Sequence, residues 1–385
     1  MYGYAPTVVS QSLQTAYAFA YAAASSLAAW DSATLRQSGV WDLAPARSRY
    51  RVAAYALAPV VLVAWLMLCL PAVVALVTAG TMPTPGSLRP LGMAMSVCVP
   101  HAVIGFGVGL WVSRLLAAPL LAVTTWVLVA FSYSTEPFWL RHVSGQYPDY
   151  LMFGELASGI SLVPHVLFAG SVAAGVALLW LPLRSASARA ALAVTVALAG
   201  TFTAYTMTST WNYNPPLLTG QAPSTCVGRN PEVCMPDFSA AGARKARNAA
   251  VGVLADLRAA GITRTPEKIV DRIEDGRYSR PSSDTVWRVD LTAAAAKGNL
   301  RYELVRAAVH FPCSAPRPAT ASAMVEWAVV TTGEQHAHNA WLKQEQSLID
   351  REEAKREAAR VHALPAAEQA AWFEQSMSTG CKKAG

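Results

Sequence analysis

The feature that most constrains this chain is a long stretch in which ionised side chains are scarce. Residues 1–208 contain only 14 charged residues, nine arginines and five acidic residues, whereas residues 209–385 contain the other 41. A helix that crosses a hydrocarbon core of roughly 30 Å needs about 20 predominantly apolar residues. The sequence therefore predicts an α-helical integral membrane domain over 1–208, followed by a polar domain over 209–385.

Five segments of the first domain are clearly long and apolar enough to cross a membrane. A sixth, 5–29, is uncharged but contains Gln11, Gln14 and several hydroxyl side chains. It fits either a helix shielded inside a bundle or a helix at the membrane surface. We expect a span, because an uncharged run of this length has few other stable positions, and residues 1–12 lack the features of a secretory signal. The six predicted transmembrane helices are 5–29, 52–80, 91–113, 115–134, 159–182 and 190–208.

Arginine placement predicts how these spans are oriented. Loops 30–51, 113–115 and 183–189 carry seven arginines, whereas only Arg89 and Arg141 lie on the other side. Positive residues concentrate on the cytoplasmic side of membrane proteins, so we expect the polar domain to lie outside the cytoplasm. The seven are Arg36, Arg47, Arg49, Arg51, Arg114, Arg184 and Arg189.

Cysteine usage adds a prediction about the polar domain. An extracytoplasmic domain occupies an oxidising space where disulfides persist. Its four cysteines allow three pairings, of which the simplest joins neighbours in sequence, 226 with 234 and 313 with 381. The other two cysteines, Cys69 and Cys98, lie within predicted spans, where we expect them to act as small apolar side chains. The four in the polar domain are Cys226, Cys234, Cys313 and Cys381.

The polar domain is expected to be a mainly helical α+β fold. Apolar residues recur at helical spacing over 239–260 and 334–362, and 286–291 alternates like a half-buried strand. Segments 299–310 and 320–331 are helical or ambiguous. We do not expect two candidate metal sites to bind a metal ion. A pair of histidines two residues apart does not share one helix face, and an acidic cluster lacks the oxygen spacing of a calcium loop. These are His336 with His338, and the acidic cluster of Asp271, Glu274 and Asp275.

Motifs for catalysis are absent from the sequence. It contains no G-x-x-x-x-G-K-[ST], H-E-x-x-H, G-x-S-x-G or C-x-x-C. We therefore predict neither an enzyme nor a cofactor. The net charge of +7 is spread without a long basic run, which argues against a nucleic-acid partner.

Polar and small residues within the spans suggest a second group of candidate positions. His101 and His165 each follow Val-Pro. An ionisable group in a membrane is a functional candidate, although both histidines have an alternative as hydrogen-bonding groups in the interface. The Val-Pro-His sequence that the two spans share indicates either a duplicated helical hairpin or a chance match. Close helix packing is predicted where small residues are four apart, at Gly105 and Gly109 and at Ser171 and Gly175.

The stretch 41–61 gathers three arginines in five residues before the second span. One interpretation is an interfacial cytoplasmic helix over 32–38, followed by a turn whose face contacts a cytosolic partner. The other is that the arginines anchor the helix end to anionic membrane lipid. The residues concerned are Arg36, Trp41, Arg47, Arg49 and Arg51.

Three stretches carry a family resemblance: Trp30 to Trp41 with APARSR at 44–49, GFGVGLWVSRLLAAPLLAV at 105–123, and the loop between Cys226 and Cys234. On these the chain resembles permease subunits of bacterial ABC-type exporters, in an actinobacterial branch with a disulfide-bearing extracytoplasmic C-terminal domain. The resemblance implies a multi-pass protein of the cell membrane, a separate ATP-binding subunit contacting 31–51, and a second permease subunit. The alternative is a non-transporting membrane anchor, sensor or assembly protein whose outer domain binds a partner.

Overall fold

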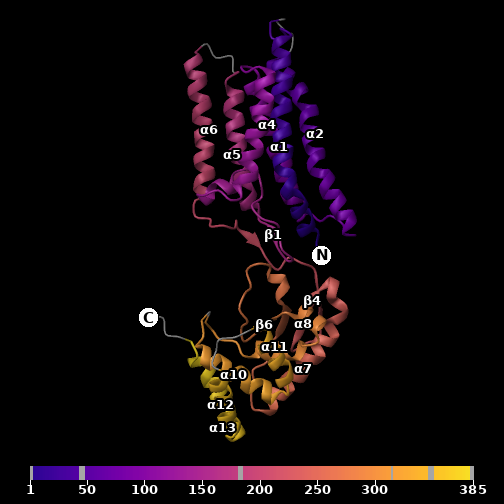
Figure 1. Ribbon diagram of the computed structural model, residues 1–385, viewed down its shortest axis with the longest axis vertical. Helices are drawn as coiled ribbons and strands as arrows, with labels where there is room; N and C mark the ends of the chain where they lie inside the picture. Colours follow the sequence, from indigo (N-terminus) through magenta and orange to yellow (C-terminus); the bar gives the residue numbers. More distant parts are fainter. Residues whose placement is uncertain (1–2, 43–47, 181–184, 314, 346–350, 382–385) are drawn as a thin grey trace. The chain divides into compact units, whose positions relative to one another are not determined.

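The computed structural model describes residues 3–42, 48–180, 185–313, 315–345 and 351–381. The chain forms two compact units, an N-terminal unit over Met1–Thr219 and a C-terminal unit over Gly220–Gly385 (Figure 1). The residues that follow the last long helix belong to the N-terminal unit, because β2 (Leu217–Leu218) pairs antiparallel with β1 (Leu156–Ala157). The division after Thr219 therefore falls later than the end of the last predicted span.

Long helices that run side by side build the N-terminal unit (Figure 1). Among the described residues, the five from α2 to α6 are long and apolar enough to cross a membrane. Many large apolar side chains on them are exposed, including Val77 and Leu115, which fits a multi-pass membrane protein. The helices are α1 (Ala5–Gln37), α2 (Arg49–Thr78), α3 (Leu88–Gly109), α4 (Arg114–Ser132), α5 (Gly159–Leu178) and α6 (Ala186–Thr208).

Helix α1 packs against α2, α3 and α4, and more than half of its residues are buried. Its buried serines satisfy their hydroxyls on carbonyls of the preceding turn, as Ser25 does on Ala22, so the helix tolerates these polar residues inside the bundle. The expectation of a separate interfacial helix over 32–38 is wrong. Residues 32–37 are the last turns of α1, because Ser32 and Ala33 are buried against the bundle and the helix continues to Gln37.

Small residues lie where helices approach most closely. A methyl group added at Gly105 would overlap the carbonyl of Ser25, and one at Gly109 would overlap that of Ala29, so α3 contacts the backbone of α1 directly. Gly175 faces the carbonyl of Ala193 at the contact between α5 and α6. Both predicted pairs of small residues therefore include positions at helix contacts.

The C-terminal ends of α1, α3 and α5 and the start of α2 lie at one end of the bundle (Figure 1). We call it the arginine end. At the opposite end, Arg89 donates to the carbonyl of Ala157 at 3.0 Å, and residues 133–158 fold back into the bundle through the short helix η1 (Phe138–His142). The described arginines of the arginine end are Arg36, Arg49, Arg51, Arg114 and Arg189, all of which lie in helices rather than in the expected loops.

A four-stranded sheet in the order β3-β4-β5-β6 forms the centre of the C-terminal unit. Strand β3 is antiparallel to β4, whereas β4, β5 and β6 are parallel. Trp287 on β6 and Trp327 on α10 are among its largest fully buried side chains. The strands are β3 (Ser224–Val227), β4 (Glu232–Pro236), β5 (Lys268–Asp271) and β6 (Val286–Val289).

Helices surround this sheet, and most agree with the predicted segments. The predicted helix over 334–362 is described as two helices, α11 and α12, on either side of 346–350, which lies outside the described residues. The helices are α7 (Ala243–Ala259), α8 (Leu291–Lys297), α9 (Leu300–Ala308), α10 (Pro318–Thr331), α11 (Gln335–Glu345), α12 (Arg351–His362) and α13 (Ala366–Thr379), with short turns η2 (Asp237–Gly242) and η3 (Arg272–Asp275).

Candidate functional site

Arg36, near the end of α1, reaches across to α3. Its Nη1 donates to the carbonyl of Leu110 at 2.7 Å and its Nη2 to that of Val112 at 3.4 Å. These carbonyls follow the last turn of α3, where helical partners run out and a cation is favourable. The charge of Arg36 therefore stabilises the end of α3.

Trp41 and Tyr50 join the connection between α1 and α2 to the other helices. The ring of Trp41 lies 6.5 Å from that of Phe106 on α3 and 5.9 Å from that of Trp180, which follows α5. The hydroxyl of Tyr50 donates to the carbonyl of Ala177 on α5 at 2.8 Å. A displacement of this connection would consequently be transmitted to α3 and α5.

Arg49 and Arg51 differ from Arg36 because their side chains are exposed. Ser48 caps α2 by accepting from the amide of Arg51. The guanidinium of Arg51 lies 5.8 Å from the ring centre of Tyr55. Of the predicted contact residues, Arg47 lies outside the described residues.

An apolar groove of about 550 Å³ opens between α2, α3 and α5, beside these arginines. Its walls are aliphatic and aromatic, so it fits a hydrocarbon rather than a charged solute. The residues that line it are Tyr50, Ala53, Ala54, Leu57, Ala58, Val61, Leu62, Trp65, Val99, Val103, Phe106, Gly107, Val176, Ala177 and Trp180.

The two predicted intramembrane histidines are connected through the backbone of one residue, Gly145, in the segment between α4 and α5. The amide of Gly145 donates to Nδ1 of the fully buried His165 at 3.1 Å, and the hydroxyl of Tyr21 donates to the carbonyl of Gly145 at 2.7 Å. The ring of His101 stacks on Tyr21 at 4.9 Å. His165 on α5 and Tyr21 on α1 therefore hold Gly145 in place, and His101 on α3 packs against Tyr21.

This segment brings a buried polar core into the bundle that the sequence analysis missed. Gln146 donates to Gln14 on α1 at 3.2 Å, and the guanidinium of Arg141 lies 3.7 Å from the ring centre of Tyr213. Partners so distant along the chain leave no periodic signal, although the sequence did show a long loop, 135–158, between two predicted spans. Within the described part of the chain, four buried atoms here have no hydrogen-bond partner: Nε of Arg141, Nδ1 of His142, Oε1 of Gln146 and Nε2 of His165.

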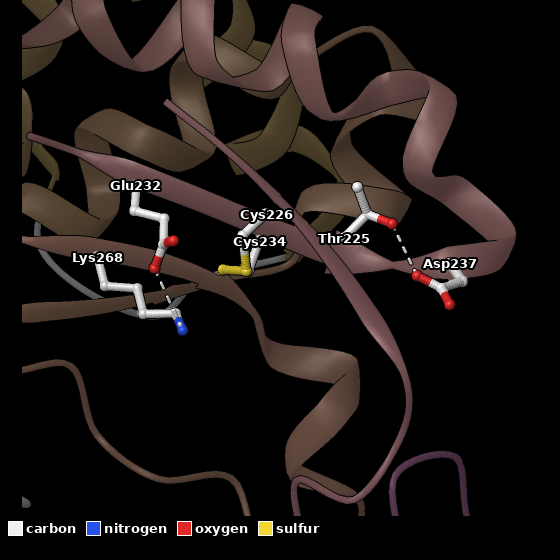
Figure 2. The surroundings of a disulfide bond; sticks show 6 residues. All are labelled: Thr225, Cys226, Glu232, Cys234, Asp237 and Lys268. Atoms are coloured by element: carbon white, nitrogen blue, oxygen red, sulfur yellow. Dashed lines mark hydrogen bonds and ion pairs between the residues drawn. A yellow bond between two sulfur atoms is a disulfide. The ribbon is translucent and has the colours of Figure 1, made fainter. Parts of the chain in front are cut away.

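The Cys226–Cys234 disulfide links directly opposed residues of β3 and β4 (Figure 2). A carboxylate oxygen of Glu232 lies within 4.8 Å of both sulfurs, but it also pairs with Lys268 at 3.4 Å. Metal ions bind thiolates, and sulfurs joined to each other are not thiolates. In the oxidised state the disulfide therefore links β3 to β4 covalently. The second disulfide joins Cys313 to Cys381, near the end of α13.

Arginines line a cleft of the C-terminal unit, which the sequence analysis also missed. It consists of two hollows of about 300 and 750 Å³ that share Arg272 and His310. Arg272 follows the carboxyl end of β5, where parallel sheets commonly bind ligands. We call it the arginine cleft, after Arg264, Arg272, Arg280, Arg288 and Arg306.

One buried acidic residue positions two of these arginines. Asp275 is fully buried and accepts from Arg280 at 2.7 Å and from Arg288 at 2.6 Å. Asp271, also buried, accepts instead from the amide and hydroxyl of Thr292. Two of the three carboxyl groups in the predicted acidic cluster, those of Asp271 and Asp275, thus accept from protein donors, whereas Oε1 of Glu274 is buried without a hydrogen-bond partner in the described ranges.

Two carboxyl groups of this region have shifted pKa values. Burial raises the pKa of Glu274 to about 7, reinforced by the negative charge of Asp271. The pKa of Asp284 is lowered by its hydrogen bond with His310 and by the charge of Arg264. Both nitrogens of His310 face oxygen atoms, of Asp284 and of the Ala307 carbonyl. A cleft with guanidinium groups held in place can bind carboxylate or phosphate.

No family model, no curated protein and no solved structure matches this chain in the three comparisons.

Proposed function

We propose that the chain is a permease-like subunit of an ABC-type exporter, which works with a separate ATP-binding subunit and a second permease subunit. The observation that carries this proposal is the anchoring of the connection between α1 and α2. Arg36 is bonded to the end of α3 and Tyr50 to α5, while Arg49 and Arg51 remain exposed. A cytosolic motor pressing on this connection would move two further helices of the bundle.

The membrane arrangement belongs to the same proposal. Helix α1 would be the sixth span, because its polar groups are covered by three neighbouring helices. The arginine end would face the cytoplasm. The C-terminal unit would lie outside, where its two disulfides persist. ATP hydrolysis would take place in the partner, since the sequence has no phosphate-binding loop of its own.

Co-purification tests the proposal. The tagged full chain is extracted from its native membranes in mild detergent and its partners are identified by mass spectrometry, with an ATP-binding subunit as the expected result. Trp41→Ala should reduce coupled ATPase activity by loosening the connection. Arg89→Ala, which removes a similar carbonyl contact at the opposite end, should leave it near the wild-type value. Preparations that never contain a nucleotide-binding subunit would refute the proposal.

The arginine cleft favours a second candidate, a membrane anchor whose C-terminal unit binds an anionic partner. Isothermal titration of the full chain with polyglutamate and polyphosphate tests it. Arg272→Ala with Arg306→Ala should abolish binding, whereas Arg258→Ala, an exposed arginine on α7, should not. In this candidate, alanine at the arginines of 31–51 leaves the biological function intact.

A further inference from the structure

The apolar groove between α2, α3 and α5 ends beside exposed positive charge. Residues three and four apart on a helix are surface neighbours. Arg49 therefore lies one turn before Ala53, and Arg51 lies one turn before Ala54, and both alanines line the groove. Hydrocarbon walls and cationic side chains are consequently adjacent at the start of α2, where Arg49 and Arg51 flank the groove-lining Tyr50 on its two sides.

The size of the groove suits one lipid chain. From Tyr50 to Trp65 the lining of α2 extends about 22 Å at about 1.5 Å per residue. Half of a hydrocarbon core measures about 15 Å, so the groove reaches through at least one leaflet. Its volume of about 550 Å³ is bounded almost wholly by apolar side chains.

The charges at this end favour a negatively charged occupant. The described part of the arginine end has five arginines against the acidic Asp31 and Asp42. Arg36 is engaged by carbonyls of α3, and the guanidinium of Arg114 lies 5.1 Å from the ring centre of Trp30. For Arg49 and Arg51, no acidic partner lies among the described residues.

We propose that the groove binds one acyl chain of an anionic phospholipid from the leaflet at the arginine end, with the lipid phosphate held between Arg49 and Arg51. The acyl chain displaces no polar group, because the walls of the groove are almost wholly apolar. The hydroxyl of Tyr50 is already used by Ala177, so headgroup selection depends on the two arginines. This site requires only a membrane and does not depend on an ATP-binding partner.

Native mass spectrometry of the full chain in mild detergent tests the site. The protein is titrated with phosphatidylglycerol and, separately, with phosphatidylcholine that carries the same acyl chains. The wild type should retain one phosphatidylglycerol in preference to phosphatidylcholine. Each arginine near a membrane surface contributes about fivefold in affinity, so Arg49→Gln with Arg51→Gln should weaken phosphatidylglycerol binding about 25-fold. Arg189→Gln, at the same end but outside the groove, is the matched control and should leave binding unchanged.

A second pair of variants tests the groove itself. Ala54 is exposed to the groove, so Ala54→Phe should fill it and reduce retention of both lipids. Ala199→Phe, on an exposed position of α6, should not. Equal retention of the two lipids by the wild type, or unchanged retention by Ala54→Phe, would overturn the proposal. Detection of a lipid-free dimer as the only species would also overturn the proposal, because a second copy of the protein would then cover the groove.

Discussion

Nδ1 of His165 accepts a hydrogen bond from the backbone amide of Gly145 at 3.1 Å, so one side chain of α5 satisfies a buried peptide group of the irregular segment before it. Leaving such a donor unpaired costs about 1–3 kcal/mol. His165→Ala should lower the stability of the N-terminal unit by about that amount, measured by thermal unfolding in detergent. His101→Ala removes only a ring stacked on Tyr21 and should cost about 0.5–1.5 kcal/mol. If His165→Ala unfolded at the wild-type temperature, the amide of Gly145 would have another acceptor.

Glu274 should make the stability of the C-terminal unit depend on pH. Burial raises its pKa from 4.5 to about 7, so the folded state holds a proton that the unfolded state releases between these values. Stability from this group is therefore full below about pH 4.5, falls as pH rises towards 7 and remains low above it. Calorimetry of the full chain at pH 5 and pH 8 should show that Glu274→Gln raises the unfolding temperature much more at pH 8 than at pH 5.

Glu267→Gln serves as the control for this pH effect, because Glu267 is exposed and close in the chain. Its unfolding temperatures at the two pH values should follow those of the wild type. If Glu274→Gln changed both temperatures equally, its carboxyl group would not be the titrating group.

Sequence reasoning predicted the features that depend on local composition. The spans follow from uninterrupted apolar runs, and their helices lie within a few residues of the predicted limits except at the end of α1, which continues to Gln37. The segment 5–29 could be assigned to a helix but not placed within the bundle, since burial of α1 depends on three neighbours. Short strands were missed for a related reason. Strand β5 has only four residues, Lys268–Asp271, too few to show alternation.

The candidate sites depend on contacts that the sequence does not encode locally. Arg36 finds its carbonyl partners 74 and 76 residues later, so its role at the end of α3 leaves no motif. The arginine cleft likewise assembles side chains from separate elements, and Asp275, which follows β5, pairs with Arg288 on the neighbouring strand β6 and with Arg280. Chemistry of this kind becomes visible only in the folded chain.

The two disulfides should differ in their contribution to stability because they close loops of different length. Cys226 and Cys234 are eight residues apart, whereas Cys313 and Cys381 are separated by 68. Loop-closure entropy assigns about 2.5 kcal/mol to the first bridge and about 4.4 kcal/mol to the second. Alanine at Cys313 and Cys381 should therefore lower the unfolding temperature of the C-terminal unit more than alanine at Cys226 and Cys234. Calorimetry of the full chain measures both, and the reverse order would contradict the loop-length argument.

Helix α3 offers an internal comparison of three glycines that separates packing from helix propensity. Gly105 and Gly109 contact backbone carbonyls of α1, whereas a methyl group at Gly92 would meet nothing within 4 Å. Gly105→Ala and Gly109→Ala should force α1 and α3 apart and destabilise the unit by about 1–3 kcal/mol, the usual cost of overpacking. Gly92→Ala should stabilise it by about 0.5–1 kcal/mol, because alanine loses less backbone entropy in a helix. Thermal unfolding of the three variants in the same detergent measures these changes. Equal stabilisation of all three would show that α1 and α3 do not pack backbone to backbone.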